Sequence, residues 1–357
     1  MNPYRGLPDF CFWSRAMTWP SPGQIDPVTS ARQIVSTDKV ATMGSCFAQH
    51  LARHIEKSGL HFYVPEDKPE DMDAAEARRR NYRVFSARYG NIYTVMQGVQ
   101  LFDRAFDDFQ PVDAVWPVAE GFVDAFRPTI DPQPHATLRH ALEARDEHLD
   151  HVRSVFTKSD WLVFTLGLTE TWRSKEDGAV YPVAPGVSGG AFDPARYEFV
   201  NYSAGETIQH LELFITKLVS VNPRLKVILT VSPVPLIATY EKRHVWVSTT
   251  VSKACLRVAA DEIERKFSNV FYFPSYEIIT SPAAGSRYYQ DDLRQVTDLG
   301  VRHVMRMFGR HYIADQLRDM PTAPPNTLTL NSEPDPEIVC DEELIEASIR
   351  VSRLSAG

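Results

Sequence analysis

Three short apolar runs constrain the fold of this chain more than any other feature of its sequence. They cover residues 161–166, 226–232 and 270–274, and apolar residues fill most of each run without alternating with polar ones. Runs of this kind are typical of strands that are buried on both faces of a parallel sheet. Residues 34–40 are rich in β-branched residues and predict the entry of a fourth strand.

Segments with helical periodicity separate these strands. Helices are predicted near residues 45–58, 95–106, 138–156, 207–221, 252–267 and 297–312. The alternation of strands and helices predicts an α/β domain whose parallel sheet is covered on both faces. Ligands of such sheets bind outside the carboxyl ends of the strands. We therefore expect the functional residues at Ser45, at Thr169 and Glu170, and in the loops 232–250 and 275–297.

The chain divides into three parts by composition. Residues 1–33 are rich in Pro, Trp and Phe and lack periodicity, which predicts an N-terminal arm packed on the body. Residues 34–320 form the predicted α/β domain, and residues 321–357 form a tail that is first Pro-rich and then acidic. Within that tail, residues 337–353 predict a terminal helix that docks on the body or contacts a partner. The arm is expected to pack through its aromatic side chains, Phe10, Phe12, Trp13 and Trp19.

Three insertions interrupt the predicted domain. The charged residues 69–80 end in an arginine run and lack a core face, so they predict an exposed insertion with a solvated helix face. Residues 115–118 and 122–126 predict the two strands of a hairpin. Residues 178–200 contain Pro-Gly and Gly-Gly pairs and predict a loop or lid rather than a phosphate-binding loop.

The composition of the chain argues against a nucleic-acid partner and a membrane partner. Of the 357 residues, 43% are hydrophobic and 24% are charged, as in soluble globular proteins. A net charge of -8 argues against a nucleic-acid partner, which would need a basic face. Since no apolar stretch approaches about 18 residues, no membrane partner is expected either.

The cysteines and histidines predict neither a disulfide framework nor a metal site. The four cysteines lie far apart without paired spacing: Cys11, Cys46, Cys255 and Cys340. His50 and His54 stand four residues apart, but no third ligand accompanies them. Unpaired cysteines and the lack of a signal-peptide pattern predict a reducing, cytoplasmic location.

A turn and a helix start follow the first predicted strand. Gly44 and Ser45 form the turn, and apolar residues then recur at helical spacing at positions 48, 51, 52 and 55. At such a junction the free backbone N–H groups and the helix dipole stabilise negative charge. The Ser45 hydroxyl is therefore either a nucleophile or a helix cap. Cys46 is the rival nucleophile, because a thiol at a helix N-terminus has a lowered pKa.

The residues around this serine resemble the sequence signature of a known family. Residues 43–48, Met-Gly-Ser-Cys-Phe-Ala, are similar to the signature of the GSCFA family, which is related to the SGNH (GDSL-like) hydrolases. Supporting stretches lie at residues 88–94, 165–172, 230–235 and 273–278, so the resemblance covers about residues 34–312. It implies a flavodoxin-like three-layer sandwich with a mainly parallel sheet. It also implies acyl-ester chemistry in which Ser45 is the nucleophile.

The resemblance also implies an oxyanion hole. The turn of Gly44 and Ser45 and the N–H group of Gly90 would hold the oxyanion, with Asn91 beside them. SGNH enzymes usually add an asparagine after the third strand. Here that turn contains Thr169 and Glu170. Thr169 would replace the asparagine, while Glu170 would either orient a histidine or serve as a buried structural carboxylate.

The expected catalytic base is missing from its usual place. SGNH enzymes carry Asp-x-x-His late in the chain, and this chain has Asp292 followed by Gln295 where the histidine belongs. Glutamine cannot accept a proton. His244 lies in a loop after a predicted strand end and is the preferred substitute, oriented by Asp292 or Glu170, although it is otherwise an ordinary loop residue.

Two further histidines lie on the last predicted helix. His303 points away from the apolar face of that helix and is predicted to be a surface residue. His311 lies deep in the helix, far from any strand end.

Two functions follow from these patterns. The first is a serine-dependent acyl-ester hydrolase or O-acyltransferase acting on an acetyl-type group of a carbohydrate or small molecule. It requires no cofactor, although a transferase would need an acyl donor such as acetyl-CoA. The alternative is a non-catalytic carbohydrate- or metabolite-binding module that has lost the usual histidine. The sequence leaves the acyl group, the acceptor and the oligomeric state open.

Overall fold

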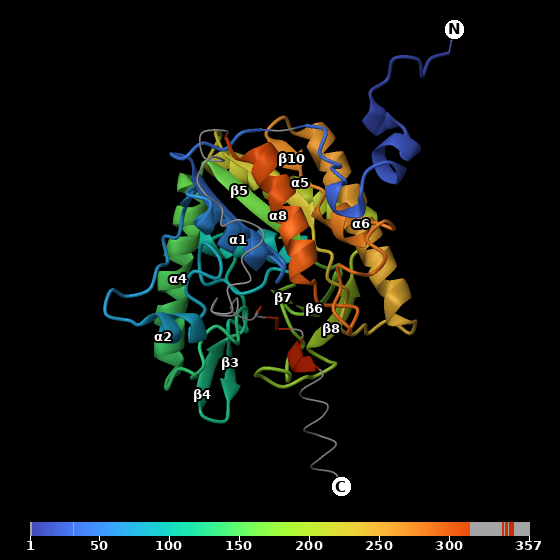
Figure 1. Cartoon of the computed structure of the whole chain (residues 1–357). Helices are drawn as coiled ribbons and strands as arrows, with labels where there is room; N and C mark the ends of the chain where they lie inside the picture. Colours follow the sequence, from blue (N-terminus) through green and yellow to red (C-terminus); the bar gives the residue numbers. More distant parts are fainter. Residues whose placement is uncertain (1, 31, 315–337, 339, 342, 346–357) are drawn as a thin grey trace.

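A five-stranded parallel sheet forms the centre of the computed structural model, which describes residues 2–30, 32–314, 338, 340–341 and 343–345 (Figure 1). The strands lie in the order β2-β1-β5-β9-β10, and every neighbouring pair is parallel. Counted along the chain this is the order 2-1-3-4-5 of flavodoxin-like folds. The strands are β1 (Lys39–Gly44), β2 (His61–Phe62), β5 (Trp161–Leu166), β9 (Lys226–Val231) and β10 (Val270–Tyr272).

Helices cover both faces of this sheet, so the predicted three-layer α/β sandwich is confirmed. The helices are α1 (Ala48–Lys57), α2 (Ala74–Arg79), α3 (Val95–Ala105), α4 (Leu138–Lys158), α5 (Ala204–Val221), α6 (Val245–Lys266), α7 (Ser275–Thr280) and α8 (Asp298–Tyr312). One hydrophobic cluster joins the sheet to α3, α4, α5 and α6. The other joins it to α1, α7 and α8, and Figure 1 shows α1 and α8 in front of the strands. Adjacent residues of β5 show the division, since Phe164 belongs to the first cluster and Val163 to the second.

Two smaller sheets lie beside the carboxyl ends of the parallel strands. The predicted hairpin is confirmed as β3 (Val115–Val118) and β4 (Gly121–Asp124), which pair antiparallel. A three-stranded sheet consists of β6 (Glu170–Ser174), β7 (Val180–Tyr181) and β8 (Tyr197–Asn201). Residues 178–200 are thus not entirely a loop as predicted. The strand β7 is only two residues long, too short for a periodic signal, and β6 provides its pairing partner.

The starts of β1 and α6 differ from the prediction for local reasons. The strand β1 begins at Lys39 because Asp38 accepts the Val35 amide in a turn at 3.1 Å, and Ile34 forms only an isolated bridge with Ile313. The helix α6 begins seven residues earlier than predicted, because the exposed side chains of its first turn interrupt the amphipathic pattern. In the charged insertion, Asp73 caps the short helix α2.

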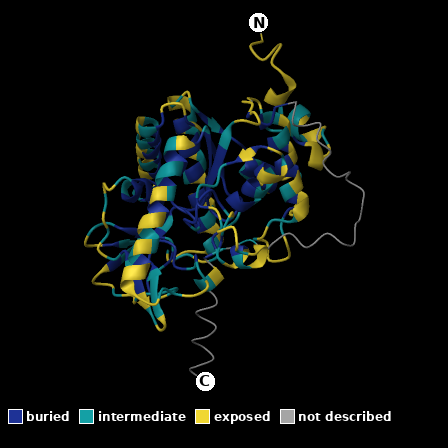
Figure 2. Ribbon diagram, turned by 90° about the vertical axis from the view of Figure 1, so that its left-hand side faces the viewer, coloured by how far each residue is buried: buried dark blue, intermediate teal, exposed yellow. Residues whose placement is uncertain are grey.

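The N-terminal arm does not pack through its aromatic residues. Phe10, Trp13 and Trp19 are 56%, 69% and 70% exposed, so this prediction is wrong. The arm consists of short turns at Asp9–Cys11, Ser14–Thr18 and Pro22–Gln24 and is mostly exposed in Figure 2. Packing begins only at Ile25, which is buried. Too few apolar groups face these aromatic rings to offset the entropy of ordering them.

Two further predictions concern the C-terminal tail and the lack of a membrane-spanning helix. The Pro-rich residues 321–336 lie outside the described residues, and of the predicted terminal helix only residues 343–345 are described as helical. Throughout the described part of the chain, no helix is both long and apolar enough to cross a membrane.

Candidate active site

Ser45 lies directly after β1, at the junction with α1, as the sequence predicts. The strand ends at Gly44, whose φ is +132°. A Cβ at this glycine would overlap the Thr165 carbonyl on β5. From the other side, a Cβ at Gly167 would lie 2.9 Å from the Cβ of Ser45. Two glycines therefore allow β1, Ser45 and the end of β5 to approach each other closely.

Residues 86–93 run along the outer edge of β1 and bring the predicted oxyanion residues to Ser45. The Ser86 hydroxyl accepts the Thr42 amide at 2.9 Å, and the Ile92 amide donates to the Gly44 carbonyl at 2.8 Å. The Tyr93 carbonyl accepts the amide of Gly167 at 3.1 Å. Since this segment is tied to the ends of both β1 and β5, Gly90 and Asn91 are held within the same site.

The Ser45 hydroxyl is buried and unpaired. Ser45 is 2% exposed, and its Oγ has no hydrogen-bond partner among the described residues, so no described imidazole contacts it. The hydroxyls of Thr42 and Thr165 on the adjacent strands are likewise unpaired. Burying a hydroxyl without a partner costs about 1–3 kcal/mol. Ser45 does not cap α1 with its side chain, because N-cap Phe47 carries no side-chain bond and Ser45 Oγ makes none.

The backbone donors around Ser45 divide into used and unused groups. The Ser45 amide donates to the Thr165 carbonyl at 3.0 Å and so extends the strand pairing instead of pointing at an oxyanion. The Gly90 amide, at a φ of +69°, has no acceptor among the described residues. Asn91 is 2% exposed, and its Nδ2 donates to the Asp341 carboxylate at 2.8 Å. Among these groups the Gly90 amide is therefore the backbone donor without a described acceptor, whereas the Asn91 side chain is already hydrogen-bonded.

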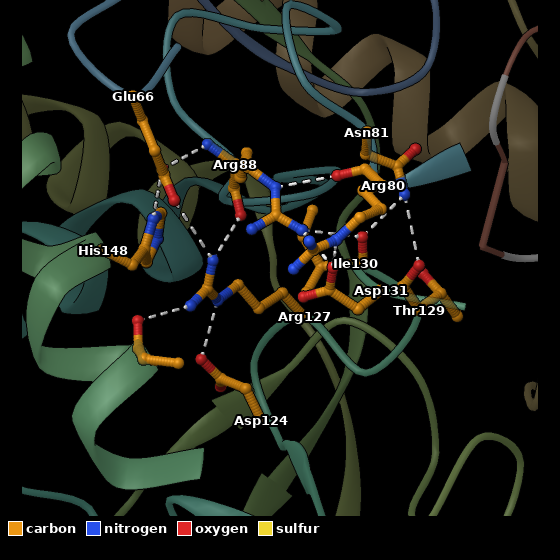
Figure 3. Close-up of polar contacts among 11 residues, drawn as sticks. Glu66, Arg80, Asn81, Arg88, Asp124, Arg127, Thr129, Ile130, Asp131 and His148 are labelled. Atoms are coloured by element: carbon orange, nitrogen blue, oxygen red, sulfur yellow. Dashed lines mark hydrogen bonds and ion pairs between the residues drawn. The ribbon is translucent and has the colours of Figure 1, made fainter. Parts of the chain in front are cut away.

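A buried ionic network holds the backbone of Arg88, two residues before Gly90 (Figure 3). At its centre, Arg127 pairs with Asp124 at 2.9 Å and donates to the Arg88 carbonyl at 3.0 Å. Glu66 accepts the Arg88 amide at 2.6 Å and contacts His148 Nδ1 at 2.7 Å. Because every one of these groups has a charged or hydrogen-bonded partner, the network fixes the backbone position of Arg88 and the residues that follow it.

The pKa values in this network follow from burial and charge. Burial lowers the pKa of His148 to about 4, with a further lowering from Arg127, so its imidazole is neutral at pH 7. Burial alone would raise the pKa of Glu66, but His148, Arg127 and the Arg88 amide lower it to about 2. A neutral His148 that donates its Nδ1–H to an ionised Glu66 is consistent with both directions.

Sequence reasoning missed this network. The arginine run at positions 78–80 was assigned to a solvated face, and Arg79 is indeed 62% exposed at its side chain. Arg80, however, pairs with Asp131 at 2.7 Å, and Arg88 pairs with the same carboxylate. These partners lie far apart in the sequence and leave no local pattern. No signal in the sequence alone could therefore have identified the pairs.

Thr169 and Glu170 have structural partners. The Thr169 hydroxyl donates to Asn201 Oδ1 at 2.7 Å. Glu170, at the start of β6, accepts the Thr239 hydroxyl at 2.7 Å and the Tyr240 amide at 3.3 Å. Burial raises the pKa of Glu170. Its described hydrogen bonds anchor the 239–240 turn to β6, and none of them is to a histidine.

His244 and Asp292 are both exposed and serve local turns. His244 is the N-cap of α6, where its Nδ1 accepts the Trp246 amide at 3.1 Å. Asp292 Oδ1 accepts the amides of Arg294 and Gln295 at 2.9 and 3.0 Å. Neither residue is hydrogen-bonded to Ser45, and no hydrogen bond between His244 and Asp292 is present.

The histidines of α8 are structural. His303 is 2% exposed, so its predicted surface position is wrong. Its Nδ1 contacts the Tyr288 hydroxyl and its Nε2 contacts the Ile25 carbonyl, both at 2.8 Å. The arm and the 284–289 turn thus cover a side of α8 that a helical pattern assigns to solvent. His311 pairs with Asp26 at 2.7 Å.

A large open cavity lies at the carboxyl end of β9, and Ser45 is not among the residues that line it. Its volume is about 1340 Å³, and it lies between the start of α6 and the 279–295 loop. Lys253 forms part of its wall, is 1% exposed and donates from Nζ to the Gly167 carbonyl at 2.7 Å. Asp292 and Gln295 also line this cavity, together with apolar residues such as Leu236 and Trp246. Among the described residues, no group of three His, Cys, Asp or Glu side chains could hold a metal ion.

Fold and site together define a parallel α/β protein of flavodoxin-like topology with a serine at the switch point between its first strand and the neighbouring third strand. The chain belongs to the GSCFA family, whose sequence profile matches residues 39–308. No curated protein matches the chain. A crystal structure of a carbohydrate esterase family 3 from Talaromyces cellulolyticus is similar at 15% identity and a TM-score of 0.35, covering 77% of this chain and 95% of that one.

Proposed function

We propose that this protein is a serine-dependent acyl-ester hydrolase that uses Ser45 as its nucleophile. The observation that carries the proposal is the buried, unpaired Ser45 hydroxyl at the switch point of the sheet. Buried polar groups are nearly always paired, so an unpaired hydroxyl in this position needs an explanation, and a reaction with a substrate provides one. Its position between Gly44 and Gly167 keeps the surrounding backbone close to the reacting atom.

The reaction follows from the groups around this hydroxyl. Ser45 Oγ attacks the acyl carbonyl while its proton passes to the base, and a tetrahedral oxyanion forms. The Gly90 amide and the Asn91 side chain stabilise that oxyanion after Asp341 has left Asn91. The ionic network keeps both donors in place, since it fixes the preceding Arg88. Collapse of the tetrahedral intermediate breaks the ester C–O bond and releases the alcohol, which takes the proton back from the base. Water then attacks the acyl-serine in the same way and releases the acid and the Ser45 hydroxyl.

His244 is the base that we assign to this reaction. Gln295 occupies the position at which SGNH enzymes place their histidine, so the proton must go elsewhere. His244 precedes Val245 and Trp246, and both of these line the cavity at the carboxyl end of β9. Because His244 does not contact Ser45, we assign it proton transfer through a water molecule. Its Nδ1 accepts the Trp246 amide, so Nδ1 must release that amide before it can accept a proton. Asp292 lines the neighbouring cavity.

The substrate that fits the cavity best is an acetyl-type ester of a carbohydrate or small molecule. The cavity presents the exposed ring of Trp246, which is 75% exposed, next to polar groups such as Asp292 and Gln295. A sugar ring can pack on an aromatic face while its hydroxyls bind the polar groups. Transfer to a sugar hydroxyl instead of water would use an acyl donor such as acetyl-CoA. The free cysteines favour a cytoplasmic setting for this activity.

Labelling with a fluorophosphonate probe tests the proposal. The probe should modify Ser45, identified by peptide mass spectrometry, and the Ser45→Ala variant should lose the label completely. Cys46→Ala is the matched control, because it removes the neighbouring thiol and should retain the label. Absence of label from the folded wild type across pH 6 to 9 would contradict the proposal.

A non-catalytic binding module is the second candidate function. Gln295 at the cavity wall and the use of the Ser45 amide in strand pairing favour it. In this case Ser45 stays unlabelled while sugars bind in the cavity. Trp246→Ala should then weaken sugar binding in calorimetric titration, while Trp13→Ala, on the exposed arm, should not.

A further inference from the structure

Two thiols from distant parts of the chain meet beside Ser45. We propose that Cys46 and Cys340 form a reversible disulfide when the protein meets a hydroperoxide, and that this bond holds Cys340 and Asp341 at the site. The two thiols would be oxidised to the disulfide, and the oxidant is a hydroperoxide such as hydrogen peroxide.

The position of Cys340 supports this bond. The Cys46 thiol forms a hydrogen bond with the Cys340 sulfur. Arg294 NH2 lies 3.4 Å from the Cys340 sulfur, and the Tyr93 hydroxyl lies 3.9 Å from it. Cys46 is 4% exposed and follows Ser45 directly, so a bond to Cys46 is made at the edge of the candidate active site.

Arg294 holds Cys340 in this place. Its Nε donates to the Pro235 carbonyl at 3.2 Å, which fixes the guanidinium at the cavity wall. The same guanidinium lies 3.5 Å from the Glu343 carboxylate. Arg294 therefore contacts both the Cys340 thiol and the helical turn that follows it.

Asp341 provides a second anchor for the same segment. It is 5% exposed, accepts the Asn91 Nδ2–H at 2.8 Å and also accepts the Thr129 hydroxyl. The two neighbouring residues thus contact both halves of the candidate site: Cys340 reaches the serine turn and Asp341 reaches the oxyanion turn.

The electrostatics make Cys340 the reacting thiol. The hydrogen bond from Cys46 and the positive charge of Arg294 lower the pKa of Cys340 to about 6, although burial opposes this. At pH 7 this thiol is largely a thiolate, the form that attacks peroxides. By contrast, burial raises the pKa of Cys255, so this cysteine is a natural internal control.

The chemistry balances with one hydroperoxide for each disulfide. The Cys340 thiolate attacks a peroxide oxygen, the O–O bond breaks, and a sulfenic acid forms while the leaving alkoxide or hydroxide takes up a proton. The Cys46 sulfur then attacks the Cys340 sulfur, the S–O bond breaks, and water leaves with the Cys46 proton. The two thiols supply two electrons, and the peroxide is reduced to water and an alcohol, or to two waters from hydrogen peroxide.

The consequence for activity rests on the proposed function. In the oxidised protein Asp341 stays on Asn91, which removes that side chain as an oxyanion donor. The label at Ser45 should therefore fall at least about tenfold on oxidation and return with a reducing agent. In a reducing cytoplasm such a disulfide would be transient, as redox-sensing disulfides are.

Mass spectrometry of the full chain tests the bond itself. The protein is treated with hydrogen peroxide at pH 7, alkylated and digested without reduction. We expect a loss of two hydrogen atoms from the intact mass and a linked peptide pair containing Cys46 and Cys340, both reversed by dithiothreitol. Cys340→Ser should lack the linked pair, whereas Cys255→Ser should form it like the wild type.

A charge variant keeps the test decisive if a cysteine variant folds poorly. Arg294→Met should form the linked pair about threefold to tenfold more slowly, because the thiolate loses its positive neighbour. Oxidation of Cys340 to a sulfinic acid while Cys46 stays alkylatable would overturn the proposal, and so would an unchanged mass. Because these readouts do not involve Ser45, an unlabelled serine in the reduced protein would count against the esterase alone.

Discussion

Two buried polar regions share the segment of residues 86–93, and they treat their polar groups in opposite ways. Among the charged residues drawn around Arg127 in Figure 3, each has a partner, as for Glu66, Asp124 and Arg88. Around Ser45, on the other side of the same segment, the hydroxyls of Ser45, Thr42 and Thr165 are buried without partners. Both regions exclude water, so the difference lies in pairing alone.

This difference in pairing separates the network around Arg127, which has a structural role, from the candidate active site around Ser45. Fully paired buried charges hold a backbone in one position, because breaking any pair leaves an uncompensated charge. Unpaired buried hydroxyls lower stability, yet the Ser45 hydroxyl is left without a partner that a substrate would have to displace. Four experiments test this contrast, beginning with the one of largest expected effect.

Removing the central cation of the network should cause the largest loss. Arg127→Met leaves Asp124 and Glu66 buried without their guanidinium, which should lower the free energy of unfolding by about 3–5 kcal/mol. Arg139→Met is the control, since the Arg139 side chain is 83% exposed and its pair with Glu143 should contribute less than about 0.5 kcal/mol. Urea unfolding measures both. Equal losses would remove the basis for calling the network a support.

Acid should weaken the network through His148. Its folded pKa of about 4 lies below the unfolded value of 6.5, so the unfolded chain binds a proton first as the pH falls. The contribution of His148 is complete above pH 6.5 and is lost between pH 6.5 and 4, by up to about 3 kcal/mol. His54 titrates in the same window, because burial also lowers its pKa to about 4. The depressed pKa of Glu66 adds a further loss below pH 4.5.

Comparison of the wild type with His148→Gln isolates this effect. On unfolding, the variant should take up about one proton fewer than the wild type between pH 6.5 and 4.5. Its free energy of unfolding should therefore change less steeply with pH, by about 1.4 kcal/mol per pH unit. Urea unfolding at several pH values measures it. Parallel curves for the two proteins would mean that His148 is not held neutral.

Crowding the serine turn should have a smaller effect on stability and a larger one on activity. Gly167→Ala places a methyl group 2.9 Å from the Ser45 Cβ and 3.0 Å from the Tyr93 carbonyl, which should cost about 1–3 kcal/mol and suppress probe labelling. Gly205→Ala, within α5, meets only Ser203 Oγ at 4.0 Å and should be neutral or slightly stabilising. Normal labelling of Gly167→Ala would show that the turn tolerates displacement.

The smallest effects should come from a matched pair of buried threonines. Thr165 and Thr230 lie opposite each other on β5 and β9, and both are fully buried. Thr230 has a hydrogen bond to Ser275 at 2.5 Å, so Thr230→Val should lower stability by about 1 kcal/mol. Thr165→Val removes an unpaired hydroxyl and should be neutral or stabilising. A larger loss from Thr165→Val would contradict the unpaired state of the hydroxyls near Ser45.

Much of the fold could be predicted because its signals are local. The runs at residues 161–166 and 226–231 are continuously apolar, which indicates strands that are buried on both faces. They form β5 and β9. The turn at Gly44 and Ser45 could be placed for the same reason, since a strand pattern changes to a helical one across it. The segment at Gly90 and Asn91 was assigned to the site only through the family resemblance.

The rest of the site has no local signal. Asn91 and Asp341 meet across 250 residues, and Tyr93 and Cys340 meet across 247. His303 appeared to face solvent because a helical pattern carries no information about Ile25, which lies 278 residues earlier in the chain. Similarly, the aromatic side chains of the arm looked like packing residues but have no apolar surface to contact.

The sequence by itself therefore determined the parallel α/β sandwich and the position of Ser45, because burial on two faces and the change from strand to helix are properties of neighbouring residues. Only the tertiary structure decided which charges are paired, which hydroxyls are left unpaired and which thiol lies beside Cys46. Those outcomes depend on contacts between segments whose separation along the chain is set by the packing of the whole fold.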